Sequence, residues 1–215
     1  KKDIKAVVKV LNSRLITQGS VVSGFEKELC NKLGYRYASA VSSGTAALHL
    51  IGLAMGWKKD DIVLTTPISF LATSNAIIYC RAKPEFVDID KDSYTIDTKK
   101  LENKIQFLRK NKKRIKAIVC TDFAGHPCDW PILKKLSKRY NLKLVNDNCH
   151  SLGAKINSDQ KYSSKFSDCA SLSFHPVKAI TTGEGGAVLT NDKRFDSKIK
   201  LLRSHGMEKK NSHEM

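Results

Sequence analysis

The feature that most constrains the fold is an alternation, along nearly the whole chain, of short apolar runs and longer stretches with helical spacing. Seven runs are expected to be strands, at residues 37–41, 61–65, 84–88, 115–121, 142–145, 170–174 and 186–190. Helical spacing occurs at residues 4–11, 21–33, 44–55, 69–79, 98–110, 129–140 and 192–204. Strands that alternate with helices of about ten to fifteen residues need crossover connections and lie parallel. We therefore expect an α/β fold with a mostly parallel sheet and helices on both faces.

Local signals refine the expected helix ends and loops. Gly34 follows the stretch 21–33 and is expected to end that helix as its C-cap. Pro131 falls near the first turn of the helix expected at 129–140, where its missing N–H costs nothing. The polar stretch 157–165 is expected to be an exposed loop. In sheets of this kind ligands bind beyond the carboxyl ends of the strands, so the residues after each strand are the candidates for a site.

The composition is that of a chain with one sizeable core. A chain of 215 residues with 41% hydrophobic residues can bury such a core. Its 12 Gly and 5 Pro residues follow no period, which excludes collagen-like and low-complexity chains. The most apolar stretch, residues 46–55, is interrupted by His49 and falls short of the roughly 18 apolar residues that a spanning helix needs. We therefore expect no membrane partner.

The net charge of +17, from 38 basic and 21 acidic residues, raises the alternative of a polyanion-binding protein. Most of the basic residues are lysines in short groups spread over the expected helices and turns, and they form no continuous stripe. We interpret them as a solvated surface and expect no nucleic-acid partner. A basic binding module remains the alternative.

Six cysteines are widely separated and form no C-x-x-C pair. Several lie in or beside apolar runs, as Cys120 does, so reduced and buried thiols are favoured over disulfides. We therefore expect no metal site and a cytoplasmic protein.

The first candidate site is the turn after the strand expected at 37–41. Ser43, Gly44 and Thr45 lead from that strand into a helix, where free N–H groups and the positive end of the helix dipole suit a phosphate. The same residues are also an ordinary helix N-cap. Neither a G-x-x-x-x-G-K-[ST] loop nor a G-x-G-x-x-G fingerprint is present.

Asp147 ends the next candidate strand, where a carboxylate can bind a sugar hydroxyl, a metal or a protonated ring nitrogen. The alternative is an Asp that only caps a turn. His150 follows three residues later and could lie against a planar cofactor, although a single His is more often structural.

Lys178 follows the strand expected at 170–174 and precedes a glycine-rich turn at 183–186. A lysine held in a pocket can lose its proton and form a Schiff base with an aldehyde. The alternative is one more solvent-facing lysine. A phosphate cradle, a carboxylate for a pyridinium nitrogen and a Schiff-base lysine together are what pyridoxal phosphate requires.

These motifs resemble the sugar aminotransferases of the DegT/DnrJ/EryC1/StrS family, within the fold type I pyridoxal-phosphate enzymes. The resemblance covers nearly the whole chain and is carried by residues 17–19, 25–26, 42–48 and 66–73, by Asp147, and by residues 171–178 and 183–186. Within the family, residues 123–127 and 173–186 most resemble the nucleotide-sugar 4-aminotransferase branch of pseudaminic acid biosynthesis. The resemblance implies the large domain of a fold type I aminotransferase and the cofactor pyridoxal 5'-phosphate.

The resemblance also implies a role for each site residue. Lys178 would form the Schiff base with the cofactor and move the proton between substrate and cofactor carbons, and Asp147 would keep the ring nitrogen protonated. The other cofactor contacts would be Gly44, Thr45 and Ser173 at the phosphate, Phe70 on one face of the ring, and His150 beside it. For Phe70 the alternative is plain core packing. Residues 146–151 depart from the family's usual Glu-Asp-x-Ala or Glu-Asp-x-Cys run, which alters the hydrogen bonding expected near the ring.

The implied reaction moves an amino group from an amino acid, by family habit glutamate, to the keto carbon of a nucleotide-linked deoxy sugar. The substrate would be of the UDP-4-keto-6-deoxy-N-acetylhexosamine type, and the full-length enzyme would be a homodimer. Two alternatives remain: a sugar dehydratase of the same fold, which would carry a His in place of Lys178, and the basic module with an unused cofactor pocket. We expect an N-terminal arm and helix at 1–20 and a cofactor-binding large domain at 21–205. Residues 206–215 would open a smaller C-terminal domain.

Overall fold

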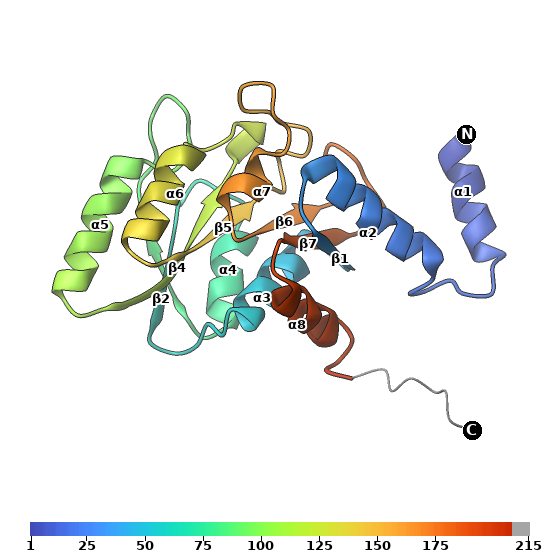
Figure 1. The fold of residues 1–215 in the computed structure, drawn as a ribbon, viewed down its shortest axis with the longest axis horizontal. Helices are drawn as coiled ribbons and strands as arrows, with labels where there is room; N and C mark the ends of the chain where they lie inside the picture. Colours follow the sequence, from blue (N-terminus) through green and yellow to red (C-terminus); the bar gives the residue numbers. More distant parts are fainter. Residues whose placement is uncertain (208–215) are drawn as a thin grey trace.

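The fold is a seven-stranded sheet with helices on both faces, described for residues 1–207 in a computed structural model (Figure 1). The strands are β1 (Tyr37–Val41), β2 (Asp61–Thr65), β3 (Lys83–Phe86), β4 (Arg114–Thr121), β5 (Lys143–Asp147), β6 (Cys169–Ser173) and β7 (Gly186–Thr190). The helices are α1 (Lys2–Leu11), α2 (Ser20–Leu33), α3 (Gly44–Ala54), α4 (Ala72–Tyr79), α5 (Thr98–Lys110), the 3-10 turn η1 (Phe123–Gly125), α6 (Trp130–Arg139), α7 (Tyr162–Phe166) and α8 (Lys193–Arg203). The predicted α/β class is confirmed.

The strand order is β1-β7-β6-β5-β4-β2-β3, and β7 runs antiparallel to both β1 and β6. The other neighbouring strands pair in parallel. Parallel pairing brings the carboxyl ends of β2, β4, β5 and β6 to one edge of the sheet, where ligands bind in folds of this kind. The antiparallel pairing of β6 with β7 turns the connection between them into a long hairpin loop at that same edge.

Apolar side chains on both faces of the strands hold the helices against the sheet. On one face α3, α4 and α8 pack on Val119 of β4 and Val145 of β5. On the other face α5 and α6 cover Ile118 and Leu144, and α2 covers Leu172 of β6. Successive residues of a strand point to opposite faces, so strands buried on both sides are expected to be continuously apolar. This explains why the strands were recognisable as short apolar runs.

The predicted helix-end signals are confirmed. Gly34 ends α2 in the left-handed conformation, with φ of 76°, and its N–H donates to the carbonyl of Cys30. Pro131 lies in the first turn of α6, and the side chain of Asp129 caps that helix by accepting from the N–H of Ile132 at 3.1 Å.

The prediction of an exposed loop over residues 157–165 is wrong at its C-terminal end. Residues Tyr162 and Ser163 belong to α7 and are buried. The reason is a hydrogen-bonded interior: the Tyr162 hydroxyl donates to Asp122 at 2.6 Å, and Asn146 donates to the Ser163 hydroxyl at 2.9 Å. Polar composition alone does not separate such partnered side chains from solvated ones.

Helix α4 begins at Ala72, whereas the spacing predicted a start at Ser69. The hydroxyl of Ser69 instead bonds to the hydroxyls of Thr73 and Thr121 in the turn before the helix. Helix α1 extends away from the sheet (Figure 1), and none of its residues is buried. Within residues 1–207, no helix combines the length and apolar character needed to cross a membrane.

Candidate active site

A cavity of about 580 Å³ lies at the carboxyl edge of the sheet. It is bounded by the turn between β1 and α3, the turn before α4, the ends of β4 and β5, and the loop between β6 and β7. All seven residues predicted for the site line it: Gly44, Thr45, Phe70, Asp147, His150, Ser173 and Lys178. Residues separated by up to 134 positions in the chain therefore meet in one place.

The turn into α3 presents unpaired backbone donors to this cavity. Ser43 caps the helix: its hydroxyl accepts from the N–H of Ala46 at 3.1 Å and its carbonyl from the N–H of Ala47 at 3.0 Å. Within residues 1–207, the N–H groups of Gly44 and Thr45 have no hydrogen-bond partner. Free N–H groups at the positive end of a helix dipole form an anion site.

Close packing fixes the position of that turn. Gly44 is buried, and a Cβ added there would lie 2.8 Å from the Cβ of Ser173. A Cβ on Gly186 would come within 2.4 Å of the backbone of Ser43. Both contacts require glycine, because each brings the turn directly against the end of β6 or the start of β7. The hydroxyl of Ser173 is thereby held beside the free N–H groups.

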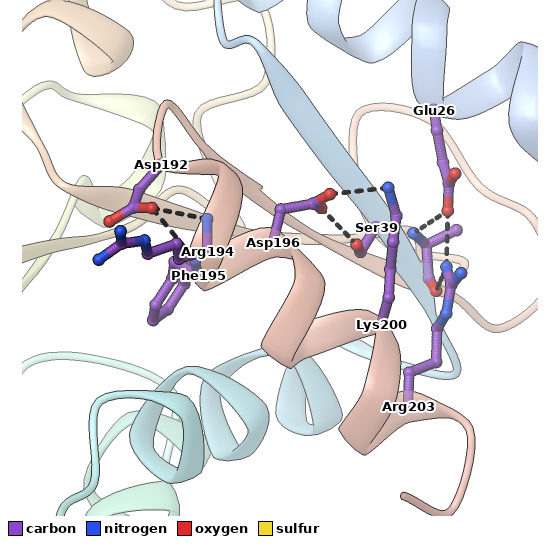
Figure 2. Close-up of polar contacts among 9 residues, drawn as sticks. Glu26, Ser39, Asp192, Arg194, Phe195, Asp196, Lys200 and Arg203 are labelled. Carbon is purple, nitrogen blue, oxygen red and sulfur yellow. Dashed lines mark hydrogen bonds and ion pairs between the residues drawn. The ribbon is translucent and has the colours of Figure 1, made fainter. Parts of the chain in front are cut away.

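Strand β1, which leads into the turn, is anchored on its outer side by α2 and α8 (Figure 2). Glu26 accepts from the N–H of Ala40 at 2.9 Å, while Arg203 donates to the carbonyl of Ala40 at 2.9 Å and pairs with Glu26 at 2.6 Å. Asp196 accepts from the hydroxyl of Ser39 at 2.8 Å. Side chains from two helices thus pair the edge-strand backbone two residues before the cavity begins.

Asp147 lies at the end of β5 with its carboxylate facing donors on both oxygens. Its Oδ2 accepts from the hydroxyl of Thr73 at 2.6 Å. Its Oδ1 accepts from the N–H of Cys149 at 3.3 Å and from the hydroxyl of Ser171 at 3.4 Å. The side chain is 3% exposed, so these contacts determine how it faces the cavity. Every partner donates, so the carboxylate acts as the acceptor in all three hydrogen bonds.

Sequence reasoning missed Thr73 and Ser171 as partners of Asp147. Thr73 lies within the motif at 66–73, but its role depends on a contact between residues 74 positions apart. The contact of Ser171 with Asp147 follows from the strand register, because the pairing of β5 with β6 places the two residues opposite each other. That signal becomes visible only once the strand order is known.

His150 is half-buried beside this carboxylate. Burial lowers the pKa of its imidazole, the nearby charge of Lys178 lowers it further, and Asp147 acts in the opposite direction. Its Nδ1 is buried and has no hydrogen-bond partner among residues 1–207. The ring of Phe123 lies edge-on, 6.0 Å away between centroids. A neutral imidazole with an unused ring nitrogen therefore borders the cavity.

A buried carboxylate supports the segment that carries His150. Asp122 is fully buried and accepts five hydrogen bonds, from Cys128, Trp130, Asn146, Ser151 and Tyr162. Burial raises the pKa of Asp122, and these donors oppose that effect. Sequence reasoning did not identify this cluster, because its members come from five separate segments. It fixes residue 151, next to His150, against the end of β4.

Lys178 lies in the hairpin loop between β6 and β7. The loop is closed at its base by two backbone hydrogen bonds, from the N–H of Phe174 to Gly185 at 2.8 Å and from the N–H of Thr182 to Phe174 at 3.0 Å. The N–H of Lys178 donates to the carbonyl of His175 at 2.9 Å. These bonds give the loop a defined path, as the glycine-rich sequence predicted.

The Lys178 side chain is half-buried and borders the cavity. Within residues 1–207 no carboxylate lies within ion-pair distance of its amine. Its charge lowers the pKa of both Cys149 and His150, in each case as a smaller effect than burial. An amine without an ionic partner is available for reaction in this position.

Phe70 is 67% exposed at the cavity mouth, in the turn before α4. The alternative that it is an ordinary core residue is therefore wrong. Its ring is free to contact a planar molecule in the cavity, which is an unusual use of a large aromatic side chain unless a ligand or partner covers it.

Comparison with known proteins gives a consistent result. The sequence profile of the DegT/DnrJ/EryC1/StrS aminotransferase family matches residues 1–215. A Campylobacter jejuni protein described as UDP-4-amino-4,6-dideoxy-N-acetyl-beta-L-altrosamine transaminase is 46% identical over 208 residues, which are 97% of this chain and 54% of that protein. The chain thus spans about half the length of the curated relatives it matches.

Two solved structures share the fold closely. Helicobacter pylori PseC, described as an aminotransferase involved in the biosynthesis of pseudoaminic acid, superposes with a TM-score of 0.89 at 39% identity. The match covers all of this chain and 56% of that one. Bacillus subtilis NtdA, solved with bound cofactor PMP, superposes with a TM-score of 0.86 at 29% identity, over all of this chain and 48% of that one.

Proposed function

Because this chain belongs to the DegT/DnrJ/EryC1/StrS aminotransferase family, we propose that it forms the cofactor-binding part of a pyridoxal-phosphate-dependent transaminase. The enzyme moves an amino group from an amino acid, by expectation glutamate, to the keto carbon of a nucleotide-linked deoxy sugar. One observation carries the proposal: a lysine amine and helix N–H groups that have no partner among residues 1–207 line the same cavity as a carboxylate.

The residues in the cavity fit pyridoxal phosphate at three points. The N-terminus of α3, with Gly44 and Thr45, offers free donors to a phosphate. Asp147 offers an acceptor to a protonated ring nitrogen, and Lys178 offers an amine to an aldehyde. The unpartnered Nδ1 of His150 gives a further polar group that a bound ring can satisfy.

When bound, pyridoxal phosphate supplies an aldehyde that condenses with amines and a ring that takes up the electron pair released at the substrate carbon. The protein's own part is to hold and move protons. Asp147 keeps a hydrogen-bond acceptor fixed at the cavity wall, so that a ring nitrogen placed there keeps its proton. When its amine is neutral, Lys178 can accept a proton at Nζ from one carbon and donate it to a neighbouring carbon.

For the sugar substrate we propose a UDP-linked 4-keto-6-deoxy-N-acetylhexosamine. Such a substrate would place the enzyme in a pathway similar to pseudaminic acid biosynthesis. The support is the 46% identity to the Campylobacter altrosamine transaminase and the similarity to PseC. The dehydratase alternative is disfavoured because the chain carries Lys178 where that branch would carry a His. The alternative of a basic binding module does not explain why the seven residues predicted to bind the cofactor line one cavity.

We further propose that the working protein is a cytoplasmic homodimer. All six cysteines are free, which suits a reducing compartment. The apolar side chains of Val177 and Ile180 are exposed in the loop that carries Lys178, where a second copy would cover them. Sedimentation equilibrium of the full-length protein tests the dimer, and a monomer at micromolar concentration would contradict it.

The experiment that tests the reaction is a transamination assay with glutamate and the UDP-4-keto sugar, read by mass spectrometry of the sugar product. We expect a mass change that corresponds to replacement of the keto oxygen by an amino group. Lys178→Ala should give no product, and Lys135→Ala, at an exposed lysine of α6, should match the parent. Loss of water from the sugar without gain of nitrogen would favour the dehydratase instead.

A further inference from the structure

Three hydroxyl groups, two of them from residues that line the cavity, form a chain of hydrogen bonds that ends on Asp147. The hydroxyl of Thr121 lies 3.1 Å from that of Ser69, and the hydroxyl of Ser69 lies 2.6 Å from that of Thr73. Thr73 then donates to Oδ2 of Asp147 at 2.6 Å. We call Thr121, Ser69 and Thr73 the hydroxyl chain. It connects the end of β4, the turn before α4 and the first turn of α4 to the end of β5.

The direction of the protons follows from the donor inventory of these groups. A hydroxyl has one proton to donate and lone pairs with which to accept. The proton of Thr73 is used on Asp147, so Ser69 must be the donor to Thr73. The proton of Ser69 is then used as well, so Thr121 must donate to Ser69. Each bond thus has a single direction, toward the carboxylate.

The position of the hydroxyl chain in the protein affects the strength of its hydrogen bonds. Thr121 and Thr73 are each 2% exposed and Asp147 is 3% exposed, whereas Ser69 is half-buried. Hydrogen-bond donors in a largely buried chain polarise one another and strengthen the final bond, which here ends on a carboxylate. Ser69 and Thr121 also border the cavity, so the chain lies beside the position of a ligand held by Asp147.

We propose that Thr73 is a positioning residue that acts on the cofactor through Asp147, with Ser69 and Thr121 fixing the orientation of its hydroxyl. This inference rests on the proposed function, because Asp147 is taken to pair with a ring nitrogen. Thr73 occupies Oδ2 while the N–H of Cys149 and the hydroxyl of Ser171 occupy Oδ1. The carboxylate is held in one orientation and kept as an acceptor, which leaves its remaining lone pair for the ring.

The test compares two ligands, because a role through Asp147 depends on the ring nitrogen. Pyridoxal phosphate has that nitrogen, and the analogue with C–H in its place does not. Dissociation constants are measured by fluorescence titration for the parent, Thr73→Val and Thr73→Ser. We expect Thr73→Val to weaken binding of pyridoxal phosphate about tenfold and binding of the analogue less than about threefold. Thr73→Ser keeps the donor and should restore most of the affinity.

A matched control is available in Thr65→Val. Thr65 is also fully buried, but its hydroxyl has no hydrogen-bond partner in the described part of the chain, so the same chemical change there should leave both dissociation constants unaltered. Ser69→Ala serves as a second probe if Thr73→Val does not fold, because it removes the donor that orients Thr73. It should weaken pyridoxal phosphate more than the analogue, by a smaller factor than Thr73→Val.

The outcomes separate this inference from the proposed function. A selective loss for pyridoxal phosphate in Thr73→Val, or in Ser69→Ala if the first variant does not fold, supports the inference. Equal losses for both ligands would give Thr73 a structural role only and overturn it, as would affinities unchanged from the parent. If the parent binds neither ligand, the proposed function itself fails and the inference falls with it.

Discussion

The hydroxyl of Thr73 and the carboxylate of Asp147 are joined by a hydrogen bond of 2.6 Å between two almost fully buried side chains. The bond connects the first turn of α4 to the end of β5, so the turn that carries Phe70 and the strand that carries Asp147 are held together. A change at either residue should therefore alter both the carboxylate and the adjoining wall of the cavity.

Asp147→Asn should leave the bond between Lys178 and the cofactor able to form while slowing proton transfer at the substrate carbon. An amide does not hold a proton on the ring nitrogen, so the ring takes up electrons poorly. We expect a rate loss on the order of 100-fold or more. Single-turnover absorbance changes on mixing the cofactor-loaded proteins with glutamate measure this step. Equal rates for the variant and the parent would reject the role of Asp147.

Thr65→Val should stabilise the protein. Within residues 1–207 the buried hydroxyl of Thr65 has no hydrogen-bond partner. Its removal takes away an uncompensated desolvation cost while the shape of the side chain is kept. We expect the free energy of unfolding to rise by about 1 kcal/mol. Thr73→Val, which removes a donor to a buried carboxylate, should lower it by about 1 to 3 kcal/mol. The free energies of unfolding are measured from urea unfolding curves with equal slopes. A stability loss in Thr65→Val would contradict the account.

Arg203→Met should loosen the strand that leads to the phosphate turn. Arg203 binds both Glu26 and the carbonyl of Ala40, so its loss leaves a largely buried Glu26 without its ionic partner (Figure 2). We expect a destabilisation of about 1 to 3 kcal/mol and weaker binding of pyridoxal phosphate. Lys104→Met is the matched control, because Lys104 pairs with the largely buried Glu85 of β3 at 2.8 Å, at the opposite edge of the sheet from β1. The same loss of cofactor affinity in both variants would argue against a specific effect on the turn.

His150 should make stability depend on pH in a defined direction. Its pKa is lowered in the folded protein, chiefly by burial, so between the folded and unfolded pKa values the unfolded chain binds more protons. Stability is therefore retained above the unfolded value of about 6.5 and is lost as the pH falls through the folded value. In His150→Gln this contribution is absent. Melting temperatures of parent and variant from pH 7.5 to 5 should diverge on acidification, with the parent losing more; parallel curves would contradict the assignment.

Most elements of the fold were predictable because they have a local signal. Apolar runs marked the strands, Gly34 and Pro131 marked helix ends, and the alternation itself predicted a parallel sheet. The prediction was wrong for α7, whose polar side chains are buried because they bond to Asp122 and Asn146, residues that are distant in sequence. No local pattern of hydrophobicity contains that information.

The same distinction applies to the site. The seven predicted residues meet in one cavity, because a strand end followed by a turn is a local pattern and parallel strands bring such ends together. Their roles stay predictions. The supporting contacts were not foreseen: the partners of Asp147 come from α4 and β6, and the hydroxyl chain joins Ser69 to Thr121 across 52 positions. Side-chain orientation after folding decides those contacts.

The central claim is that Lys178 forms the covalent bond to pyridoxal phosphate, and borohydride reduction followed by peptide mass mapping tests it most directly. The purified protein is incubated with the cofactor, reduced and digested, alongside Lys178→Ala and Lys135→Ala. The account predicts one main adduct, on Lys178, in the parent and in Lys135→Ala, and none in Lys178→Ala, whose melting temperature should stay close to that of the parent. A specific adduct on another lysine, or visible absorbance of the bound cofactor that persists in Lys178→Ala, would contradict it.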